Sequence, residues 1–237
     1  MTGFANKNVL ILGGSRGIGA AIVRRFAGDG ARVAFTYAGS HDAAVALAAE
    51  TGSEAIRTDS ADRDAVIATV ASRGSIDVLI VNAGIAMIGD PLTFAPDDVD
   101  RMIEVNVHSP YHASVEAARQ MSDNGRIIII GSVNGDRISF PGAAAYGLTK
   151  SAVQGMVRGL ARDFGSRGIT VNNIQPGPVD TDMNPADGPL AEMVHGFMAI
   201  KRHIHVDDIA ELTAYVAGPH GAMITGSMLT IDGGFGA

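Results

Sequence analysis

The sequence predicts an α/β fold: a single domain with a doubly wound parallel seven-stranded sheet and helices on both faces. Short apolar runs alternate with amphipathic stretches at a steady interval. The runs are rich in β-branched residues and flanked by glycines, and some, such as Ile127–Ile130, are apolar at every position. Central parallel strands that are covered by helices on each side have this pattern. The alternation therefore predicts right-handed βαβ units around one sheet.

Seven strands and six helices are expected, and the patterns give their limits. The strands are Asn8–Leu12, Arg32–Tyr37, Glu54–Thr58, Ile76–Val81, Arg126–Ile130, Thr170–Ile174 and Met228–Ile231. The helices are Ile18–Ala27, Asp42–Glu50, Asp62–Ser72, Asp97–Met121, Ala144–Phe164 and Val206–Ala217. The fourth helix is expected either to be continuous or to break at Pro110, because proline removes a helical hydrogen bond.

Composition excludes several classes of function. The 237 residues suffice for one domain over residues 1–237, and no linker or repeat divides them. The chain has no cysteine, which excludes disulfides, thiolate metal sites and cysteine nucleophiles. Its net charge is −7 and its basic residues are scattered, so no nucleic-acid partner is expected. The N-terminal apolar run is interrupted by Gly13-Gly14, which fits a cytoplasmic protein without a membrane segment.

The segment from Pro176 to His205 is the least regular part of the chain, rich in proline, glycine, methionine and histidine. Connections in α/β units are ordinarily short. We expect this segment to form a lid over a binding site, with a subunit contact as the alternative. His203 and His205 are interpreted as solvated lid side chains, because no third metal ligand is evident. No metal site is expected.

A glycine-rich turn joins the first strand to the first helix. It has the spacing G-x-x-x-G-x-G over Gly13–Gly19. Glycines there allow a tight turn and bring backbone N–H groups against a pyrophosphate at the positive end of the helix. A plain tight turn is the alternative, but the strand–turn–helix context favours a dinucleotide site. The cofactor contacts expected from this turn are Gly13, Ser15, Arg16, Gly17, Ile18 and Gly19.

The end of the second strand favours NADP(H) over NAD(H). NAD-binding proteins place a carboxylate there to hold the ribose 2′-hydroxyl. This chain has Tyr37 followed by Ala38-Gly39-Ser40. A 2′-phosphate would meet Arg16, the Ser40 hydroxyl and local N–H groups, so Tyr37, Gly39 and Ser40 are assigned to the cofactor site. The alternative is that Arg16 only solvates the loop surface.

Two further strand ends carry polar or small residues where ligands bind in this architecture. Asp59, followed by Ser60, comes after the third strand and could accept a hydrogen bond from the adenine amino group. Asn82-Ala83-Gly84 follows the fourth strand, where small residues allow the adenosine to lie close. Simple turn formation is the alternative for both.

Four residues are the candidates for catalysis. Tyr146 and Lys150 are four residues apart in a helical pattern, which puts phenol and ammonium on one face. A phenol ordinarily titrates near pH ~10, and a neighbouring cation favours its ionised form. Lys150 could also bind the nicotinamide ribose, so both residues belong to the cofactor site as well. Ser132 follows the fifth strand and could hold a substrate oxygen, and Asn106 could position a water beside Lys150.

This ordered set of motifs resembles the short-chain dehydrogenase/reductase family over the whole chain. The resemblance implies a Rossmann fold, hydride exchange between NADPH and a carbonyl or alcohol substrate, and a homotetramer or homodimer. The segment Gln175–Thr181 is similar to the family's nicotinamide-side motif, which implies cofactor contacts at Pro176, Gly177, Val179 and Thr181. One departure is Leu12, where the family usually has a threonine whose hydroxyl braces the glycine turn.

Stretches outside these general motifs resemble bacterial members of the family that bind cyclic di-GMP. They include Tyr111–Met121 and Ile130–Arg137. The resemblance implies an alternative role, in which the chain binds cyclic di-GMP and promotes biofilm dispersal. Arg16 and Arg137 would be the candidate phosphate contacts, although the chain lacks the R-x-x-D motif common in cyclic-di-GMP sites.

Overall fold

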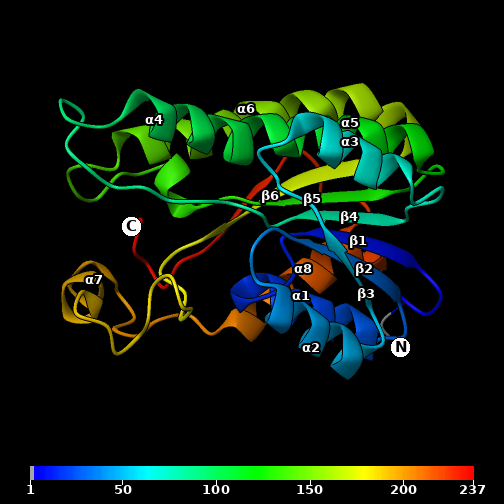
Figure 1. Ribbon diagram of the computed structural model, residues 1–237, viewed down its shortest axis with the longest axis horizontal. Coiled ribbons are helices and arrows are strands. Elements are labelled where there is room, and N and C mark those ends of the chain that lie inside the picture. The colour runs from blue at the N-terminus through cyan, green and yellow to red at the C-terminus, as the bar shows by residue number, and fades with distance from the viewer. Residues whose placement is uncertain (1–2) are drawn as a thin grey trace.

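The computed structural model describes residues 3–237. They form one domain around a seven-stranded, all-parallel sheet with the order β3-β2-β1-β4-β5-β6-β7 (Figure 1). The strands are β1 (Asn8–Leu12), β2 (Arg32–Tyr37), β3 (Glu54–Arg57), β4 (Val78–Val81), β5 (Arg126–Ile130), β6 (Thr170–Pro176) and β7 (Met228–Ile231). The predicted fold class and strand number are confirmed.

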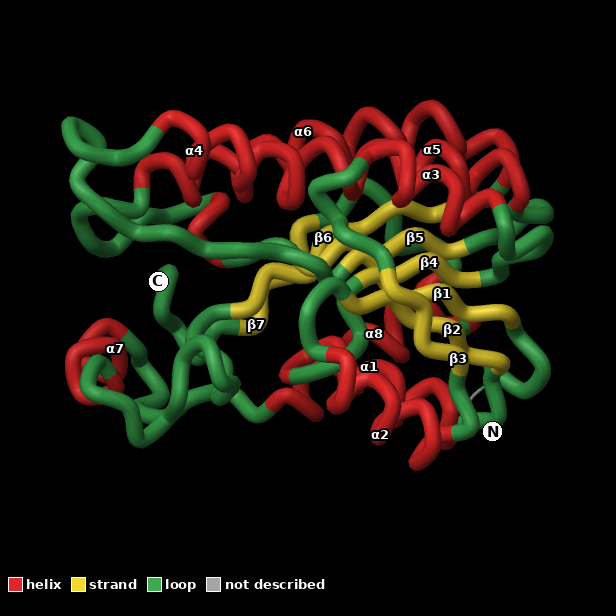
Figure 2. The backbone as a smooth tube through the Cα atoms, in the orientation of Figure 1, coloured by secondary structure: helices red, strands yellow, loops and turns green. Residues whose placement is uncertain are grey.

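Helices cover both faces of the sheet (Figures 1 and 2). One face carries α1 (Gly17–Gly28), α2 (His41–Thr51) and α8 (Val206–Ala217). The other carries α3 (Arg63–Ala71), α5 (Ser109–Gln120) and α6 (Ala144–Phe164). The remaining helices are α4 (Pro96–Ile103) and α7 (Ala191–Phe197). Within residues 3–237, no helix is both long and apolar enough to span a bilayer.

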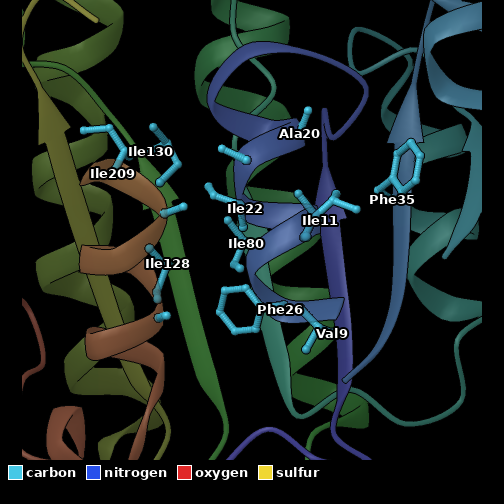
Figure 3. Packing of buried hydrophobic residues seen from close by; sticks show 14 of the residues in the cluster. Val9, Ile11, Ala20, Ile22, Phe26, Phe35, Ile80, Ile128, Ile130 and Ile209 are labelled. Carbon is cyan, nitrogen blue, oxygen red and sulfur yellow. The ribbon is translucent and has the colours of Figure 1, made fainter. Parts of the chain in front are cut away.

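The continuous apolar strands are explained by two hydrophobic clusters, one on each face. Side chains alternate along a strand. Ile128 and Ile130 of β5 therefore pack into the cluster under α1 and α8, which Figure 3 shows around Phe26. Ile127 and Ile129 pack into the cluster under α3, α5 and α6. Burying a side chain of this size contributes about 1.5–3 kcal/mol, so the two clusters hold the helices firmly on the sheet.

Strand order reverses between β1 and β4, which are neighbours in the sheet although two strands separate them in the chain. In open α/β sheets the crevice at such a reversal, outside the carboxyl ends of the strands, is where ligands bind. Here two successive N–H groups after β4, those of Asn82 and Ala83, donate to the Leu12 carbonyl at 2.9 and 2.8 Å. The glycine turn and the Asn82–Gly84 segment are thus held side by side at this crevice.

The helical segment from Pro96 to Gln120 does not break at Pro110. α4 leads into a wider π turn, Glu104–His108, and α5 follows with Pro110 near its start. In an α-helix, a proline ring collides with the carbonyl four residues earlier. The π turn lies on those preceding residues and uses i→i+5 bonds, as in Ser109 N to Glu104 O. The proline is therefore accommodated by a bulge one turn before it.

The segment after β6 is more ordered than the sequence indicates. β6 continues through Gln175 and Pro176, which pair with Thr230 and Ile231 of β7. The segment then contains α7, which lies beyond the sheet end on the side of the C-terminus (Figure 2). Met198, directly after α7, is buried against Val133 and Phe235. The proposed lid therefore has a helix and a small core of its own.

Candidate functional site

The glycine turn is fixed by contacts from two neighbouring strands. Gly13 has a φ of +79°, and a Cβ there would lie 2.7 Å from the backbone of Ala83. Its N–H donates to the Thr36 hydroxyl at 2.9 Å, and Gly14 N donates to the Thr36 carbonyl at 2.9 Å. Thr36 on β2 thus supplies the side-chain brace that Leu12 cannot. The structure explains how the turn tolerates the departure from the family pattern.

Asn82 fixes the turn from the other side. Its side-chain amide donates to the Gly13 carbonyl at 2.7 Å. A Cβ at Gly19 would lie 2.1 Å from that same carbonyl, so the first turn of α1 packs directly on the loop. A Cβ at Gly17 would lie 3.3 Å from the Thr181 side chain. The glycine turn and the segment after β6, both predicted to bind one cofactor, are therefore in contact.

The end of β2 carries no carboxylate, as the sequence indicates. Tyr37 is buried, and its hydroxyl is hydrogen-bonded to Nδ1 of His41 at 2.8 Å. Ser40 is the N-cap residue of α2, and its side chain makes no capping hydrogen bond. Arg16 is exposed, and its only ion-pair partner among residues 3–237 is Asp182 at 4.0 Å. The Arg16 guanidinium is available to an anion at this edge.

Asp59 forms a turn and an ion pair. Its Oδ1 accepts from Ala61 N at 2.9 Å, and Arg101 of α4 approaches Oδ2 at 3.3 Å. The Ala61 hydrogen bond, with a smaller contribution from Arg101, holds the pKa of Asp59 below its usual range. The ionised carboxylate can still accept from an amino group, because about half of its side chain is exposed. The turn-forming alternative is correct for this residue, and it leaves the binding role open.

Tyr146 and Lys150 lie in the first two turns of α6, on the side that faces the end of β5. Lys150 is 6% exposed, and its Nζ lies 5.7 Å from the centre of the Tyr146 ring. The ammonium donates to the Ile130 carbonyl at 3.3 Å. A buried ammonium needs hydrogen-bond acceptors to offset its lost hydration. No carboxylate ion pair to Lys150 forms within the described residues, which makes a ligand contact energetically useful.

Ser132 follows β5 by two residues and is nearly buried. Its Oγ accepts from Asn134 N at 3.1 Å and caps the short turn Val133–Gly135. Its carbonyl accepts from Nε2 of Gln175 on β6 at 3.2 Å. Since the Oγ is an acceptor in that capping bond, its O–H is left to donate elsewhere.

Asn106 lies in the π turn and joins three parts of the site. Its side chain accepts from Ile85 N at 2.9 Å, and donates to Ile85 O at 2.8 Å and to the Thr149 hydroxyl at 3.0 Å. A Cβ at Gly84 would lie 3.4 Å from both Asn106 Oδ1 and Lys150 Nζ. Asn106, Gly84 and Lys150 therefore converge. The Asn106 side chain uses both amide hydrogens and one of the two Oδ1 lone pairs, so the second Oδ1 lone pair or the main chain could hold a water.

The Asn106 main-chain carbonyl lacks its ordinary helical partner. In an α-helix this carbonyl would accept from the N–H four residues later, and that residue is Pro110, which has none. The π turn and the proline thus leave the Asn106 main-chain carbonyl without the usual i+4 donor. π turns inside helices often occur at functional sites for this reason.

The lid side of the site contains a histidine pair that sequence reasoning did not identify. Nε2 of His195 on α7 is 2.7 Å from Nδ1 of His203. His203 is 7% exposed, so its interpretation as a solvated side chain was wrong. Its neighbour Ile204 pairs with Val179, which anchors it in the structure. His205 is exposed and caps α8. Among residues 3–237, no group of three metal-ligating side chains forms.

The two arginines that are candidates for cyclic-di-GMP contacts differ in availability. Arg137 donates to the main-chain carbonyls of Gly236, at 3.0 Å, and Ala237. Arg16 is exposed and only loosely paired. Binding of a phosphate by Arg137 would therefore have to displace contacts that already exist.

Sequence reasoning missed several supporting residues, which all act through their neighbours. Thr36 braces the glycine turn, Thr149 joins Asn106 to the Tyr146 carbonyl, and Arg101 pairs with Asp59. Thr36 and Arg101 belong to no short motif, and Thr149 occupies a position between Tyr146 and Lys150 that the motif leaves variable. Their partners are separated by at least 20 residues in most cases, so only the fold brings them together.

Comparisons with known proteins agree with this geometry. The family model described as enoyl-(acyl carrier protein) reductase matches residues 13–236. The chain is 63% identical over 237 residues to the cyclic-di-GMP-binding biofilm dispersal mediator protein of Escherichia coli (strain K12), with 100% of both chains covered. The crystal structure of BdcA in complex with NADPH is also 63% identical, with a TM-score of 0.98 over 99% of this chain and 96% of that one.

A further solved structure, the short-chain dehydrogenase/reductase from Serratia marcescens BCRC 10948, is 51% identical with a TM-score of 0.95 over 99% of each chain. The matches cover the cofactor turn, the Tyr146–Lys150 pair and the last strand together. The chain belongs to the short-chain dehydrogenase/reductase family.

Proposed function

We propose that the chain is an NADP(H)-dependent oxidoreductase that transfers a hydride between the nicotinamide and a carbonyl or alcohol substrate. The observation that carries the proposal is that the Lys150 ammonium lies beside the Tyr146 ring and donates to the Ile130 carbonyl, two residues before Ser132 at the carboxyl end of β5. A fold alone does not imply an activity, but this set of side chains has a specific chemical use. The family membership and the titles of its relatives support the same reaction class.

The residues around the glycine turn fit an NADP cofactor. A Cβ at Gly13 or Gly19 would collide with neighbouring backbone, so glycine at these two positions keeps the turn tight. Arg16 and Ser40 offer donors where a 2′-phosphate would lie, and no carboxylate at the end of β2 would repel it. One further observation supports NADP(H): the related BdcA was solved with NADPH.

When bound, NADPH supplies the hydride that the substrate carbonyl carbon accepts. Ser132 donates a hydrogen bond to the substrate oxygen and stabilises the negative charge that develops there. The Tyr146 hydroxyl transfers its proton to that oxygen, which completes the alcohol. The Lys150 ammonium stabilises the tyrosinate that remains and holds the nicotinamide ribose in place. In the oxidation direction each proton transfer is reversed.

Proton resupply to Tyr146 uses Lys150 and the π turn. The Asn106 carbonyl can accept from a water that also contacts the Lys150 ammonium, because Pro110 does not occupy it. The Asn106 side chain keeps the π turn fastened to Ile85 and Thr149. Its role is to position the carbonyl, and the chemistry is carried by Tyr146 and Lys150.

The segment 176–205 acts as the lid over the substrate. α7 and Met198 pack on Val133 and Phe235. Val133 directly follows Ser132 in the chain, and Phe235 comes shortly after the last strand. Closure of the lid would exclude water while the hydride moves.

The test is NADPH oxidation with a panel of ketones and aldehydes, read by absorbance. Wild type should oxidise NADPH with at least one of them. Tyr146→Phe should lower kcat on the order of a hundredfold or more and keep its NADPH affinity. Tyr111→Phe, at an exposed tyrosine of α5, is the matched control and should keep full turnover. Full turnover by Tyr146→Phe would refute the assignment of Tyr146 as the proton donor.

A second function has one supporting observation, the name of the 63% identical E. coli relative. We propose as the alternative that the chain binds cyclic di-GMP and promotes biofilm dispersal, with oxidoreductase activity secondary. Calorimetry with cyclic di-GMP, with and without saturating NADPH, tests it. If saturating NADPH abolishes the heat of cyclic-di-GMP binding, the two ligands share one site involving Arg16. Arg16→Ala should then weaken the binding of both ligands. No heat at high micromolar ligand would refute cyclic-di-GMP sensing.

A further inference from the structure

Tyr37 and His41 form a hydrogen-bonded pair at the edge where the adenosine ribose of a dinucleotide would lie. The Tyr37 hydroxyl and the His41 Nδ1 are 2.8 Å apart, and the two rings are inclined by 44°. Tyr37 is 8% exposed, so its ring is held by the core, whereas His41 is exposed at the start of α2. A fixed partner therefore orients a solvent-accessible imidazole.

The hydrogen bond determines what His41 presents to a ligand. In the neutral tautomer with its proton on Nε2, the Tyr37 hydroxyl donates to Nδ1. If the imidazole is protonated, Nδ1–H donates to the Tyr37 oxygen and Nε2 again carries a proton. In both states the outward Nε2–H is a donor. The pair thus builds a donor whose charge can change while its direction stays the same.

The charged groups around His41 come from four segments. The glycine turn contributes Arg16, whose loop is tied to β2 through Thr36. Arg57, the last residue of β3, is the register partner of Tyr37. The first turn of α2 contributes Asp42. Asp59, after β3, is already engaged by Ala61 and Arg101. Asp42, together with Asp182 as the ion-pair partner of Arg16, offsets the two arginines in formal charge, so a protonated His41 would supply the additional positive charge that suits a phosphate.

We infer that His41, oriented by Tyr37, binds the 2′-phosphate of NADPH and makes the preference for NADPH over NADH depend on pH. The inference rests on the proposed NADP(H) site and adds a residue to it. A neighbouring phosphate dianion favours the protonated form of an imidazole. Binding of NADPH should therefore draw a proton onto the imidazole at neutral pH, whereas NADH should not.

The test compares dissociation constants of NADPH and NADH at pH 6.5 and pH 8 for wild type, His41→Gln and Tyr37→Phe. Charge-assisted hydrogen bonds contribute enough for a roughly tenfold change in affinity. His41→Gln should weaken NADPH binding by about that factor at pH 6.5 and by less at pH 8. It should leave the affinity for NADH unchanged. Tyr37→Phe should have a smaller effect of the same kind. His220→Gln, at an exposed histidine beside Tyr215, is the matched control.

Calorimetry in buffers of different ionisation enthalpy gives an independent readout. The wild type should take up more protons on binding NADPH than His41→Gln does. Protons taken up by the phosphate itself are common to both proteins and cancel in the difference. Unchanged NADPH affinity in His41→Gln would overturn the inference. Equal losses for NADPH and NADH would also overturn it, because they indicate a structural role. Failure of the wild type to bind NADPH at all would instead refute the proposed cofactor.

Discussion

Gly13 and Gly52 have nearly the same backbone conformation but different surroundings. Their φ angles are +79° and +68°. A Cβ at Gly52, which ends α2, would meet nothing within 4 Å, whereas one at Gly13 would lie 2.7 Å from the backbone of Ala83. The left-handed conformation explains the glycine at position 52. At position 13 the close approach of two strands is a second and stronger reason.

We expect Gly52→Ala to cost about 1–2 kcal/mol of unfolding free energy, the ordinary cost of a left-handed non-glycine residue. Gly13→Ala should cost at least ~2 kcal/mol more, because backbone must move to relieve the collision. It should also weaken NADPH binding, whereas Gly52→Ala should not. Urea denaturation and an NADPH titration of both variants measure this. Equal destabilisation by the two would show that the contact with Ala83 does not matter.

The chemical role of a single residue was predictable from the sequence where that residue belongs to a motif with a defined spacing. The glycine turn, Tyr146 and Lys150 have their chemistry encoded in local spacing. The brace at Thr36 was not predictable, because the sequence shows the loss at Leu12 and gives no sign that another strand replaces it. The burial of His203 was missed for a similar reason. Its environment is made by α7 and by the segment at Val179, which are distant in the chain.

At the scale of elements, the π turn is the feature with the clearest functional consequence. It accommodates Pro110 and leaves the Asn106 carbonyl without an i+4 donor, and the Asn106 side chain and the Lys150 ammonium both lie beside Gly84. The sequence predicted a helix here and gave a break at Pro110 as the alternative. It could not predict a bulge, because the choice between a break and a π turn depends on packing against α6 and the Ile85 backbone.

Pro110→Ala tests this interpretation of the π turn. The alanine N–H can donate to the Asn106 carbonyl, which would then be less able to hold a relay water. We expect kcat to fall about tenfold, with unchanged NADPH affinity and equal or greater thermal stability. Pro219→Ala, in the short turn Pro219–Gly221, is the control for proline removal. Unchanged turnover in Pro110→Ala would show that the carbonyl takes no part in proton transfer.

The His195–His203 pair should make the lid sensitive to acid. Burial, and then the neighbouring His195 imidazole, lower the pKa of His203. In the unfolded chain a histidine gains its proton near pH ~6.5, and in the folded chain His203 gains it at a lower pH. Between these values the unfolded state binds more protons, so this contribution to stability is present above pH ~6.5 and is lost progressively as the pH falls from there through the lower folded-state pKa.

We therefore expect the melting temperature to drop between pH 7.5 and 5.5, and to drop less in His203→Gln. Burial also lowers the pKa of His112, which acts in the same direction, so only the difference between variant and wild type is informative. Differential scanning fluorimetry across this range gives both curves. Parallel curves would mean that His203 titrates alike in the folded and unfolded chain.

For the molecule as a whole, the sheet order decides where chemistry can occur. Two hydrophobic clusters hold helices on both faces, and the reversal between β1 and β4 opens one edge to ligands. Every candidate residue for cofactor or catalysis belongs to a segment at that edge. The strand limits were predicted well because both faces are buried and the apolar runs are short. The lid was predictable only as an irregular segment, because its helix packs on distant residues such as Val133 and Phe235.

The central claim is that this edge performs hydride transfer with Tyr146 as the proton donor. The most direct measurement follows deuterium from NADPH labelled at both C4 positions into the alcohol formed from the best carbonyl compound of the panel, read by mass spectrometry. Wild type should give an alcohol with one deuterium on the carbinol carbon. Tyr146→Phe should give almost none, while it binds NADPH as tightly as wild type. The account would be contradicted if the wild type transferred no deuterium to any carbonyl compound, or if Tyr146→Phe transferred it at the wild-type rate.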